Sequence, residues 1–404
     1  MQMMKKAERI LWASTATVGV LLAAGCGGGG GGGGDSRVSF DASALIANEA
    51  NNVITQTYSD LNTRAGLLLT AVQALADGDA TEAELDAAQA AWRNTRVPWE
   101  TSEGFLFGPV DALGVDPAID SWPLNTPDLK AYLAANPNTT QQDIENAGDD
   151  LRGFHAMEWL LFGLDDDGQD NNDMAVADLI NQTGAINYLV ALAQAFQAQT
   201  QLLADSWTTD FNGNGAYADD VANPGPGQLF ASQSAVVEEL VNGVIGIASE
   251  VGAAKIADPF GTSIGQADTS QVESQYSWNS LTDFHNNIQS VLNVYTGKRG
   301  FDPDTDTVSA GLNGLYAFVA AHDQALAQRV YDEIIAAQSR IALIKGDGDD
   351  SSTEITGDAK PFREQILNEA GRALIEDAID AVLMLATTLE TEVLPLVANT
   401  DFAG

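Results

Sequence analysis

The stretch Gly153-Phe154-His155-Ala156-Met157-Glu158-Trp159-Leu160-Leu161-Phe162-Gly163 decides how the rest of the chain is interpreted. At 3.6 residues per turn, Leu151, His155, Glu158 and Phe162 fall on one stripe of a helix. The stripe is apolar enough to face a core, yet it carries an imidazole and a carboxylate one turn apart. A buried charge without a partner costs several kcal/mol. The pair must therefore be satisfied by each other, by polar groups of other helices, or by a metal ion.

The chain has 404 residues, enough for two domains with cores of their own. It is strongly acidic, because 18 Lys+Arg against 57 Asp+Glu give a formal net charge of −39. Such a surface repels phosphate backbones, so we do not expect nucleic-acid binding. It attracts cations, which suits a metal-binding protein, although the same charge can serve only solubility or salt tolerance.

Residues 1–25 have the pattern of a bacterial lipoprotein signal peptide. Lys5, Lys6 and Arg9 form a basic start, and an apolar run follows. Leu22-Ala23-Ala24-Gly25-Cys26 resembles the lipobox, in which the cysteine becomes the lipidated first residue of the mature protein. Cys26 is the only cysteine, so it cannot form an internal disulfide. The alternative is a cleaved signal peptide with an incidental cysteine.

Residues 26–39 predict the lipidated Cys26 followed by a Gly-rich tether, since the glycine run Gly27 to Gly34 is flexible. No later apolar run reaches about 18 residues, so nothing else is expected to span a membrane. Gly27 rather than Asp after Cys26 favours the outer membrane. We therefore expect a lipoprotein of the cell envelope, on the periplasmic or surface side.

The rest of the chain is predicted to be all-α, as two tandem four-helix-bundle-like domains packed against each other. The first domain covers 40–210, a linker covers 211–228, and the second domain covers 229–404. Helices are expected over 41–76, from a Thr81/Glu84 capping box to near Pro98, and over 149–163, 174–207, 229–256, 277–295, 309–345 and 361–397. No convincing strand pattern is present. Prolines and large aromatics between 98 and 127 predict an ordered excursion that packs onto the bundle.

Three acidic loops, at 165–173, 302–306 and 347–350, fail the spacing of an EF-hand. We therefore interpret them as solvated turns.

Polar groups concentrate in three aromatic-rich stretches, 92–108, 153–163 and 273–288, where an ordinary bundle helix would be cleanly amphipathic. The candidate ligand-binding residues in them are Trp92, Arg93, Glu100, Phe105, Trp278, Ser280, Asp283 and Asn286. Amides and carboxylates here can orient a ligand, or they can cap helices and fix bundle register.

His155 and Glu158 are the centre of the expected metal site. Residues at i and i+3 project side by side, so a neutral imidazole and a carboxylate can share one divalent ion. Nitrogen and oxygen donors suit iron or zinc, with further ligands from Glu103 or from Glu100, Glu273 and Asp283. The spacing alone is a weak signal, and a satisfied core pair remains equally open.

Signatures of common enzymes are missing. The sequence has no His-Glu-x-x-His, no Gly-x-Ser-x-Gly elbow and no P-loop. Ferritin-like di-iron bundles use paired Glu-x-x-His helices, whereas here the order is reversed and the motif occurs once.

Gly153-x-His155-x-x-Glu158 followed by Leu161-Phe162-Gly163 resembles the Gly-x-His-x-x-Glu motif of the imelysin-like proteins. The stretches 98–111 and 276–287 are similar to its flanking signatures, and the resemblance runs from about Phe40 to Val397. It implies two similar four-helix bundles with the site at their interface. His155 and Glu158 would be ligands or a ligand-orienting pair, faced by Glu103, Trp278, Ser280 and Asp283.

The imelysin-like family includes iron-regulated bacterial proteins and relatives of the EfeO-type iron-uptake component. Its founding name came from an insulin-cleaving membrane protease. The resemblance therefore implies iron, another divalent metal or a metal complex at the interface, with a role in iron uptake or homeostasis and envelope iron-transport partners. Because His-Glu-x-x-His is missing, we favour metal handling without catalysis. A zinc-dependent metallopeptidase is the second reading, and a non-catalytic helical interaction module is the third.

Overall fold

The computed structural model describes residues 37–164, 174–346 and 358–403, which belong to one compact unit. The described chain is about 70% helical with almost no strand, so the all-α prediction is confirmed. The predicted signal peptide, Cys26, most of the tether and the acidic loops at 165–173 and 347–350 lie outside the described residues. The boundaries of the two predicted domains stay a prediction.

The expected helix over 41–76 is a continuous helix that is interrupted by a π-helical segment. It consists of α1 (Ser43–Asn48), a π-helical segment (Glu49–Ile54) and α2 (Thr55–Ala74). Next comes α3 (Glu82–Glu100), whose start has the predicted capping box: the Thr81 amide donates to Glu84 Oε2 (2.8 Å), and the Glu84 amide donates to Thr81 Oγ1.

The helix was predicted to end near Pro98, and α3 runs through this proline and ends two residues later, at Glu100. A proline lacks the amide that would bond the carbonyl four residues earlier. Here that carbonyl, Asn94 O, accepts a hydrogen bond from Arg64 Nη1 of α2 at 3.0 Å. The neighbouring helix thus satisfies the acceptor that Pro98 leaves open.

The Pro-rich excursion is ordered and packs on the helices. It contains a 3₁₀ turn (Glu103–Phe105), α4 (Pro109–Ala112) and α5 (Val115–Ile119), and Phe105 and Val110 are buried. Two further helices, which the sequence analysis did not predict, follow as α6 (Thr126–Ala135) and α7 (Gln141–Glu145).

The central motif forms α8 (Phe154–Phe162), preceded by a 3₁₀ turn (Asp149–Leu151). All nine residues of α8 are buried, so the predicted single apolar stripe is wrong: the helix faces protein on every side. The expected helix over 174–207 is two helices, α9 (Val176–Asn181) and α10 (Ala185–Thr208). They are separated at Gly184, whose φ is +84°.

The rest of the chain is also helical, and even the expected linker contains α11, whose Tyr217 is buried. The α-helices are α11 (Tyr217–Ala222), α12 (Gln233–Glu250), α13 (Ala257–Phe260), α14 (Ser280–Thr296), α15 (Leu315–His322), α16 (Gln324–Lys345), α17 (Phe362–Gln365), α18 (Glu369–Thr388) and α19 (Leu394–Ala398). Two π-helical segments, Val251–Ile256 and Leu389–Val393, join α12 to α13 and α18 to α19.

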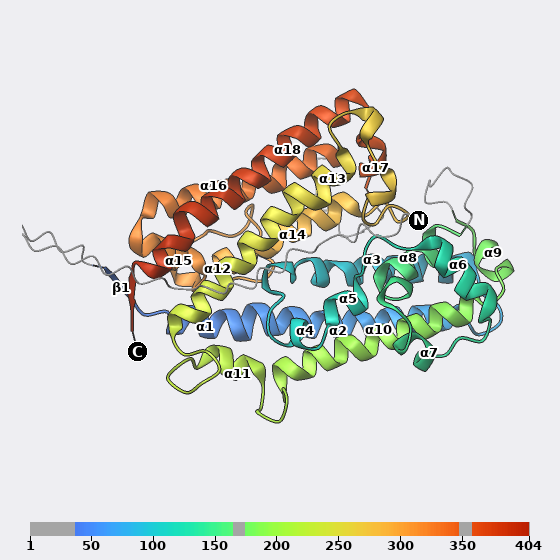
Figure 1. Cartoon of the computed structure of the whole chain (residues 1–404), viewed down its shortest axis with the longest axis horizontal. Helices are drawn as coiled ribbons and strands as arrows, with labels where there is room; N and C mark the ends of the chain where they lie inside the picture. Colours follow the sequence, from blue (N-terminus) through green and yellow to red (C-terminus); the bar gives the residue numbers. More distant parts are fainter. Residues whose placement is uncertain (1–36, 165–173, 347–357, 404) are drawn as a thin grey trace, which may run out of the picture. The chain divides into compact units, whose positions relative to one another are not determined.

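Helices of each half pack together, and a few contacts link the halves. In Figure 1, α2 lies beside α10; α2 also contacts α3, and α16 packs against both α14 and α18. From the second half, α12 packs against the 3₁₀ turn at Glu103–Phe105, and α14 packs against α3. The end of α3, the first part of α8, the π-helical segment after α12, the start of α14 and the loops after α5 and before α14 supply the buried polar residues described below.

Two short strands were not predicted. β1 (Val38–Phe40) pairs in parallel with β2 (Thr400–Phe402), with Val38 opposite Thr400. The ring of Phe318 on α15 stacks on Phe402 at 5.8 Å and meets Phe40 edge-on at 5.5 Å.

The helical stretches Gln233–Phe260 and Glu369–Ala398 are long enough and apolar enough to cross a membrane, by length and composition alone. The sequence had predicted no such run. In the structure both stretches also contribute to the buried core, for example through Val241 and Leu385.

Candidate metal centre

Gly153 allows α8 to begin close to the backbone that follows α5. Its φ is +86°, a conformation that favours glycine. A β-carbon at this position would lie 2.4 Å from the carbonyl oxygen of Ile119. Since Gly153 has no side chain, the backbone at Ile119 can lie directly against it. This close approach lets Asp120, the residue after Ile119, reach His155 on the first turn of α8.

The His155 ring is fully buried and has carboxylates at both nitrogens. Nδ1 lies 3.1 Å from Glu158 Oε2. Nε2 lies 3.2 Å from Asp120 Oδ1 and 3.8 Å from Glu273 Oε1. Nε2 has no well-aligned hydrogen-bond partner among the described residues. The imidazole therefore presents one nitrogen to a pair of acids while the other is held.

Glu158 is held by the backbone just before α14. Its Oε1 accepts hydrogen bonds from the amides of Tyr276 (3.0 Å) and Ser277 (2.9 Å) and from the Ser277 hydroxyl (2.8 Å). Two nearby residues, Ser274 (φ 51°) and Trp278 (φ 55°), adopt left-handed conformations that are unfavourable for such side chains. This strained turn surrounds one oxygen of Glu158, and the other oxygen bonds His155.

Arg96 is the central cation. Its side chain is fully buried on α3 and forms ion pairs with four carboxylates. Nη2 lies 2.9 Å from Glu273 Oε1 and 3.2 Å from Asp283 Oδ2, and the guanidinium pairs closely with Glu100 and Asp120. Each of these acids would be costly to bury without such a partner.

Lys255 is a second cation at the same acids. It lies in the π-helical segment after α12, and its Nζ is 3.1 Å from Glu273 Oε2 and 3.8 Å from Glu100 Oε2. Its side chain is 11% exposed, whereas that of Glu100 is fully buried. Lys255 therefore lies at the edge of the cluster.

The carboxylates are also anchored by neutral donors. Trp99 Nε1 donates to Asp120 Oδ2 at 2.6 Å, and Asn287 Nδ2 donates to Glu100 Oε2 at 2.6 Å. Asp283 accepts from the Asn279 amide group at 2.8 Å. These bonds fix the orientation of each acid before any ligand arrives.

The surrounding charges set the protonation states. Burial alone would raise the pKa of Asp120, but Arg96 overrides this and brings it well below its usual range. The pKa of Glu273 is also lowered, because Lys255 and Arg96 outweigh burial. Burial alone would lower the pKa of His155, but its contacts with Asp120 and Glu158 raise it to about 9. At neutral pH two ionised acids therefore face a protonated imidazole.

For two other acids, burial has the largest effect on the pKa. It raises the pKa of Glu100 well above the usual value despite Arg96 and Lys255. It does the same for Glu103, where Lys255 again opposes the shift.

The donor set at His155 fits a metal ion. Ligand atoms of Asp120, His155 and Glu273 all lie within 4.8 Å of one another. Nitrogen and oxygen ligands bind first-row metals at about 2.0–2.2 Å, so two ligands of one ion lie about 3–4 Å apart. The separations of 3.2 and 3.8 Å from His155 Nε2 are of this size. A second group, Glu100, Glu103 and Asp120, also lies within 4.8 Å and shares Asp120.

Comparison with known proteins identifies the family of the chain. The sequence model of the imelysin family matches residues 54–389. The chain belongs to the imelysin family. Iron-regulated protein A of Synechococcus elongatus is 29% identical to this imelysin-family chain over 360 residues, 88% of each protein. The predicted resemblance is thus confirmed.

Solved structures of the imelysin family have the same fold. A protein described as an iron-regulated protein A precursor, from Parabacteroides distasonis, matches with a TM-score of 0.72 and 28% identity, covering 89% of this chain and 94% of that one. An imelysin-like protein from Psychrobacter arcticum matches with a TM-score of 0.63 and 15% identity, covering 90% and 98%. The latter likeness concerns the fold alone.

Several predicted site residues of this imelysin-family chain lie in the cluster or support it. Glu100 and Asp283 bond Arg96, and half-buried Glu103 lies beside Glu100 and Asp120. The Ser280 hydroxyl donates to the carbonyl of Glu273.

Other predicted residues brace the elements around the cluster. Trp92 Nε1 donates to the carbonyl of Phe154 at 3.0 Å, and Arg93 Nη2 donates to the carbonyl of Ser277 at 2.8 Å. The ring of Phe105 packs edge-on against Tyr58 in the core. Trp278 forms part of the strained turn, and Asn286 is half-buried on α14.

Three residues of the cluster were missed. Arg96 had a detectable signal, since it lies one turn from both Trp92 and Glu100 on α3. Lys255 is the only charged residue between Val251 and Ala257, which is a weaker signal. Asp120 had none, because only the fold of the Pro-rich excursion brings it to His155.

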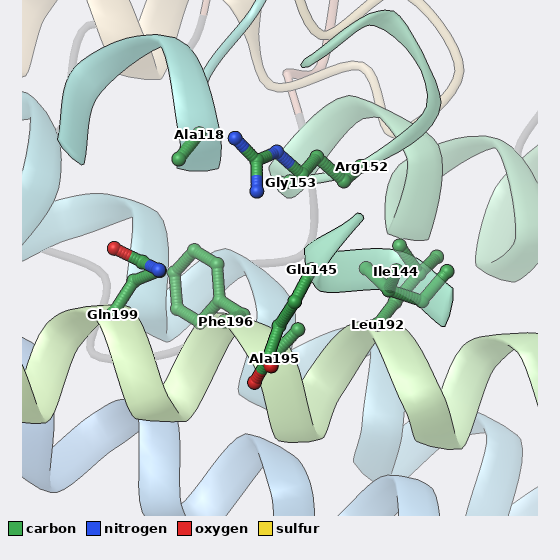
Figure 2. A pocket seen from close by; sticks show the side chains of 9 residues that line it. All are labelled: Ala118, Ile144, Glu145, Arg152, Gly153, Leu192, Ala195, Phe196 and Gln199. Atoms are coloured by element: carbon green, nitrogen blue, oxygen red, sulfur yellow. The ribbon is translucent and has the colours of Figure 1, made fainter. Parts of the chain in front are cut away.

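A separate small cavity lies beside the cluster but does not contain it. Figure 2 shows its lining, which includes Phe196 and Ala195 of α10 together with Arg152 and Gly153. Its volume of about 10 Å³ holds one water molecule at most. It offers no room for a substrate.

Proposed function

We propose that this imelysin-family protein binds iron(II) at Asp120, His155 and Glu273 and serves iron uptake or homeostasis without catalysis. The observation that carries the proposal is the buried Nε2 of His155, which faces two ionised carboxylates and lacks an aligned hydrogen-bond partner in the described part of the chain. Imidazole together with carboxylates suits first-row transition metals such as iron and zinc.

Glu158 acts in this proposal as the partner that orients His155. Ligand histidines commonly donate their second N–H to a carboxylate, which fixes the tautomer and the ring. Here Glu158 Oε2 is the carboxylate oxygen that bonds His155 Nδ1, while Glu158 Oε1 already accepts three hydrogen bonds. An acid so engaged is poorly placed to activate water, which disfavours the metallopeptidase reading.

The cellular role is inferred from the relatives and the sequence. Two relatives carry "iron-regulated" in their descriptions. The lipobox at Cys26 and the glycine tether favour an anchored protein of the cell envelope, on the outer membrane, that meets metal ions or complexes and passes them to iron-transport partners. The net charge of −39 supports accumulation of cations near its surface.

The test is a metal titration of the protein without its first 34 residues, purified without chelating resin. We expect one iron(II) per chain, with zinc(II) as comparison, and at least a hundredfold loss of affinity in His155→Ala. His322→Ala is the matched control, because His322 bonds Thr400 outside the cluster. Absence of metal binding, or equal binding by His155→Ala, would refute the proposal. A large loss of melting temperature in His155→Ala without any metal dependence would indicate a purely structural His–Glu pair.

A further inference from the structure

The cluster contains two neighbouring positions for a cation, and a lysine lies between them. The inner position is Asp120, His155 and Glu273, and the outer one is Glu100, Glu103 and Asp120. Lys255 Nζ is 3.1 Å from Glu273 of the inner group and 3.8 Å from Glu100 of the outer group. Its ammonium thus contacts one acid of each position, and it lowers the pKa of Glu273.

Lys255 is the less firmly held of the two permanent cations. Arg96 is fully buried and pairs with four acids through a planar, multiply bonded group. Lys255 has two ion pairs, partial exposure and a flexible stem. Its charge also interacts with half-buried Glu103 and with Glu250, which is exposed, so an acid lies on the solvent side of Lys255 as well.

An ion at the inner position would share Glu273 with Lys255. Two cations only a few ångströms apart in a poorly solvated site repel strongly. Arg96 pairs with the same acids but cannot leave without uncovering all four of them. The repulsion therefore acts chiefly on Lys255.

We propose that Lys255 is a built-in competitor for the metal: its ammonium holds the carboxylates of the empty centre and withdraws towards Glu103 and Glu250 when an ion enters. The inference rests on the proposed function and adds the residue that sets its affinity. Lys255 holds Glu273 and Glu100 in place while the centre is empty, and it weakens metal binding so that the ion can be released again.

The test compares Lys255→Met with the wild type and with Lys298→Met, which removes a lysine paired with Asp306 outside the cluster. At pH 7 we expect Lys255→Met to bind iron(II) at least tenfold more tightly than the wild type, and Lys298→Met to match it. Without metal, Lys255→Met should melt lower than the wild type, and saturating metal should raise its melting temperature more.

The outcomes separate the two proposals. If the wild type binds no metal, the proposed function fails. If the wild type binds metal and Lys255→Met binds it equally or more weakly, the competitor role is refuted and Lys255 is structural. If Lys255→Met does not fold, Lys255→Arg tests the inference in its place. A guanidinium that bonds the acids at two points is expected to weaken metal binding at least tenfold. An unchanged metal affinity of Lys255→Arg would overturn the inference.

Discussion

Both nitrogens of His155 face acids, and this governs how the residue responds to pH. Interactions with Asp120 and Glu158 raise its pKa to about 9 against the effect of burial. A metal ligand must be the neutral imidazole, so metal binding at Nε2 has to release the proton that the acids stabilise.

We therefore predict that metal affinity weakens as the pH falls. Below about pH 9 the imidazole is protonated, and each further unit should weaken the apparent affinity about tenfold. Asp120 and Glu273, whose pKa values are lowered, stay ionised over pH 6–8 and add no second proton. Competition titrations at pH 6, 7 and 8 measure the slope, and a flat profile would show that His155 is not a ligand.

Glu49 predicts a pH effect on stability instead. It is fully buried on the first π-helical segment, and neither carboxylate oxygen has a hydrogen-bond partner in the described structure. Burial raises its pKa well above the usual value. The contribution of Glu49 to the free energy of unfolding is therefore fully present below the pKa that its carboxyl has in the unfolded chain. It is lost as the pH rises through the higher pKa of that carboxyl in the folded protein.

The isosteric change Glu49→Gln should remove this loss. We expect the variant to melt within about 2 °C of the wild type at pH 5 and several degrees higher at pH 8. Glu392→Gln is the control, because Glu392 pairs with Arg329 and its pKa is lowered, so that substitution should not stabilise at any pH. A constant gap between Glu49→Gln and the wild type would contradict the prediction.

The sequence predicts part of the site at this scale. His155 and Glu158 were identifiable because the chain has three histidines and one lies three residues before a glutamate in an apolar run. Asp120 and Lys255 were not, because their roles arise from the tertiary fold, which brings a loop and a π-helical turn together. The partners of Glu158 are backbone amides, which no residue type reveals.

Among the secondary-structure elements, α8 depends on close approach at its first residue. Gly153→Ala would place a β-carbon 2.4 Å from Ile119 O at a φ of +86°. We predict a stability loss of about 2–4 kcal/mol from the contact and the backbone strain together. Because the backbone displaced at Ile119 also carries Asp120, metal affinity should fall as well.

Denaturant melts and metal titration check this prediction, and Gly227→Ala supplies the control. Gly227 has a similar φ of +84°, but a β-carbon there meets nothing within 4 Å. The control should lose only about 1–2 kcal/mol for its left-handed backbone and keep its metal affinity. Equal losses at both positions would mean that the approach to Ile119 does not matter.

The long helices were predictable, whereas the short helices α6, α7 and α11 and several helix ends were not. The capping box at Thr81 depends on adjacent residues and is formed as predicted. The sequence did not show how α3 passes through Pro98, because Arg64, 34 positions earlier, bonds the carbonyl that the proline leaves free. The π-helical segments, one of which carries Lys255, have no distinct sequence pattern.

The acidity of the whole molecule leads to a prediction about salt. With a net charge of −39, repulsion between surface carboxylates opposes folding at low ionic strength. Raising NaCl from about 0.05 to 1 M shortens the screening length to about 3 Å and should raise the melting temperature by several degrees. Sucrose of equal osmolality controls for solvent effects, and an equal rise in sucrose would show that screening is not the cause.

The pairing of β1 with β2 has a mechanical consequence. β1 lies at the end of the predicted tether, and its partner β2, near the other end of the chain, runs in the same direction. If the tether is anchored as proposed, a pull on it would reach β1 first. The hydrogen bonds between β1 and β2 would then share the load with the opposite terminus before it reached the helices around His155.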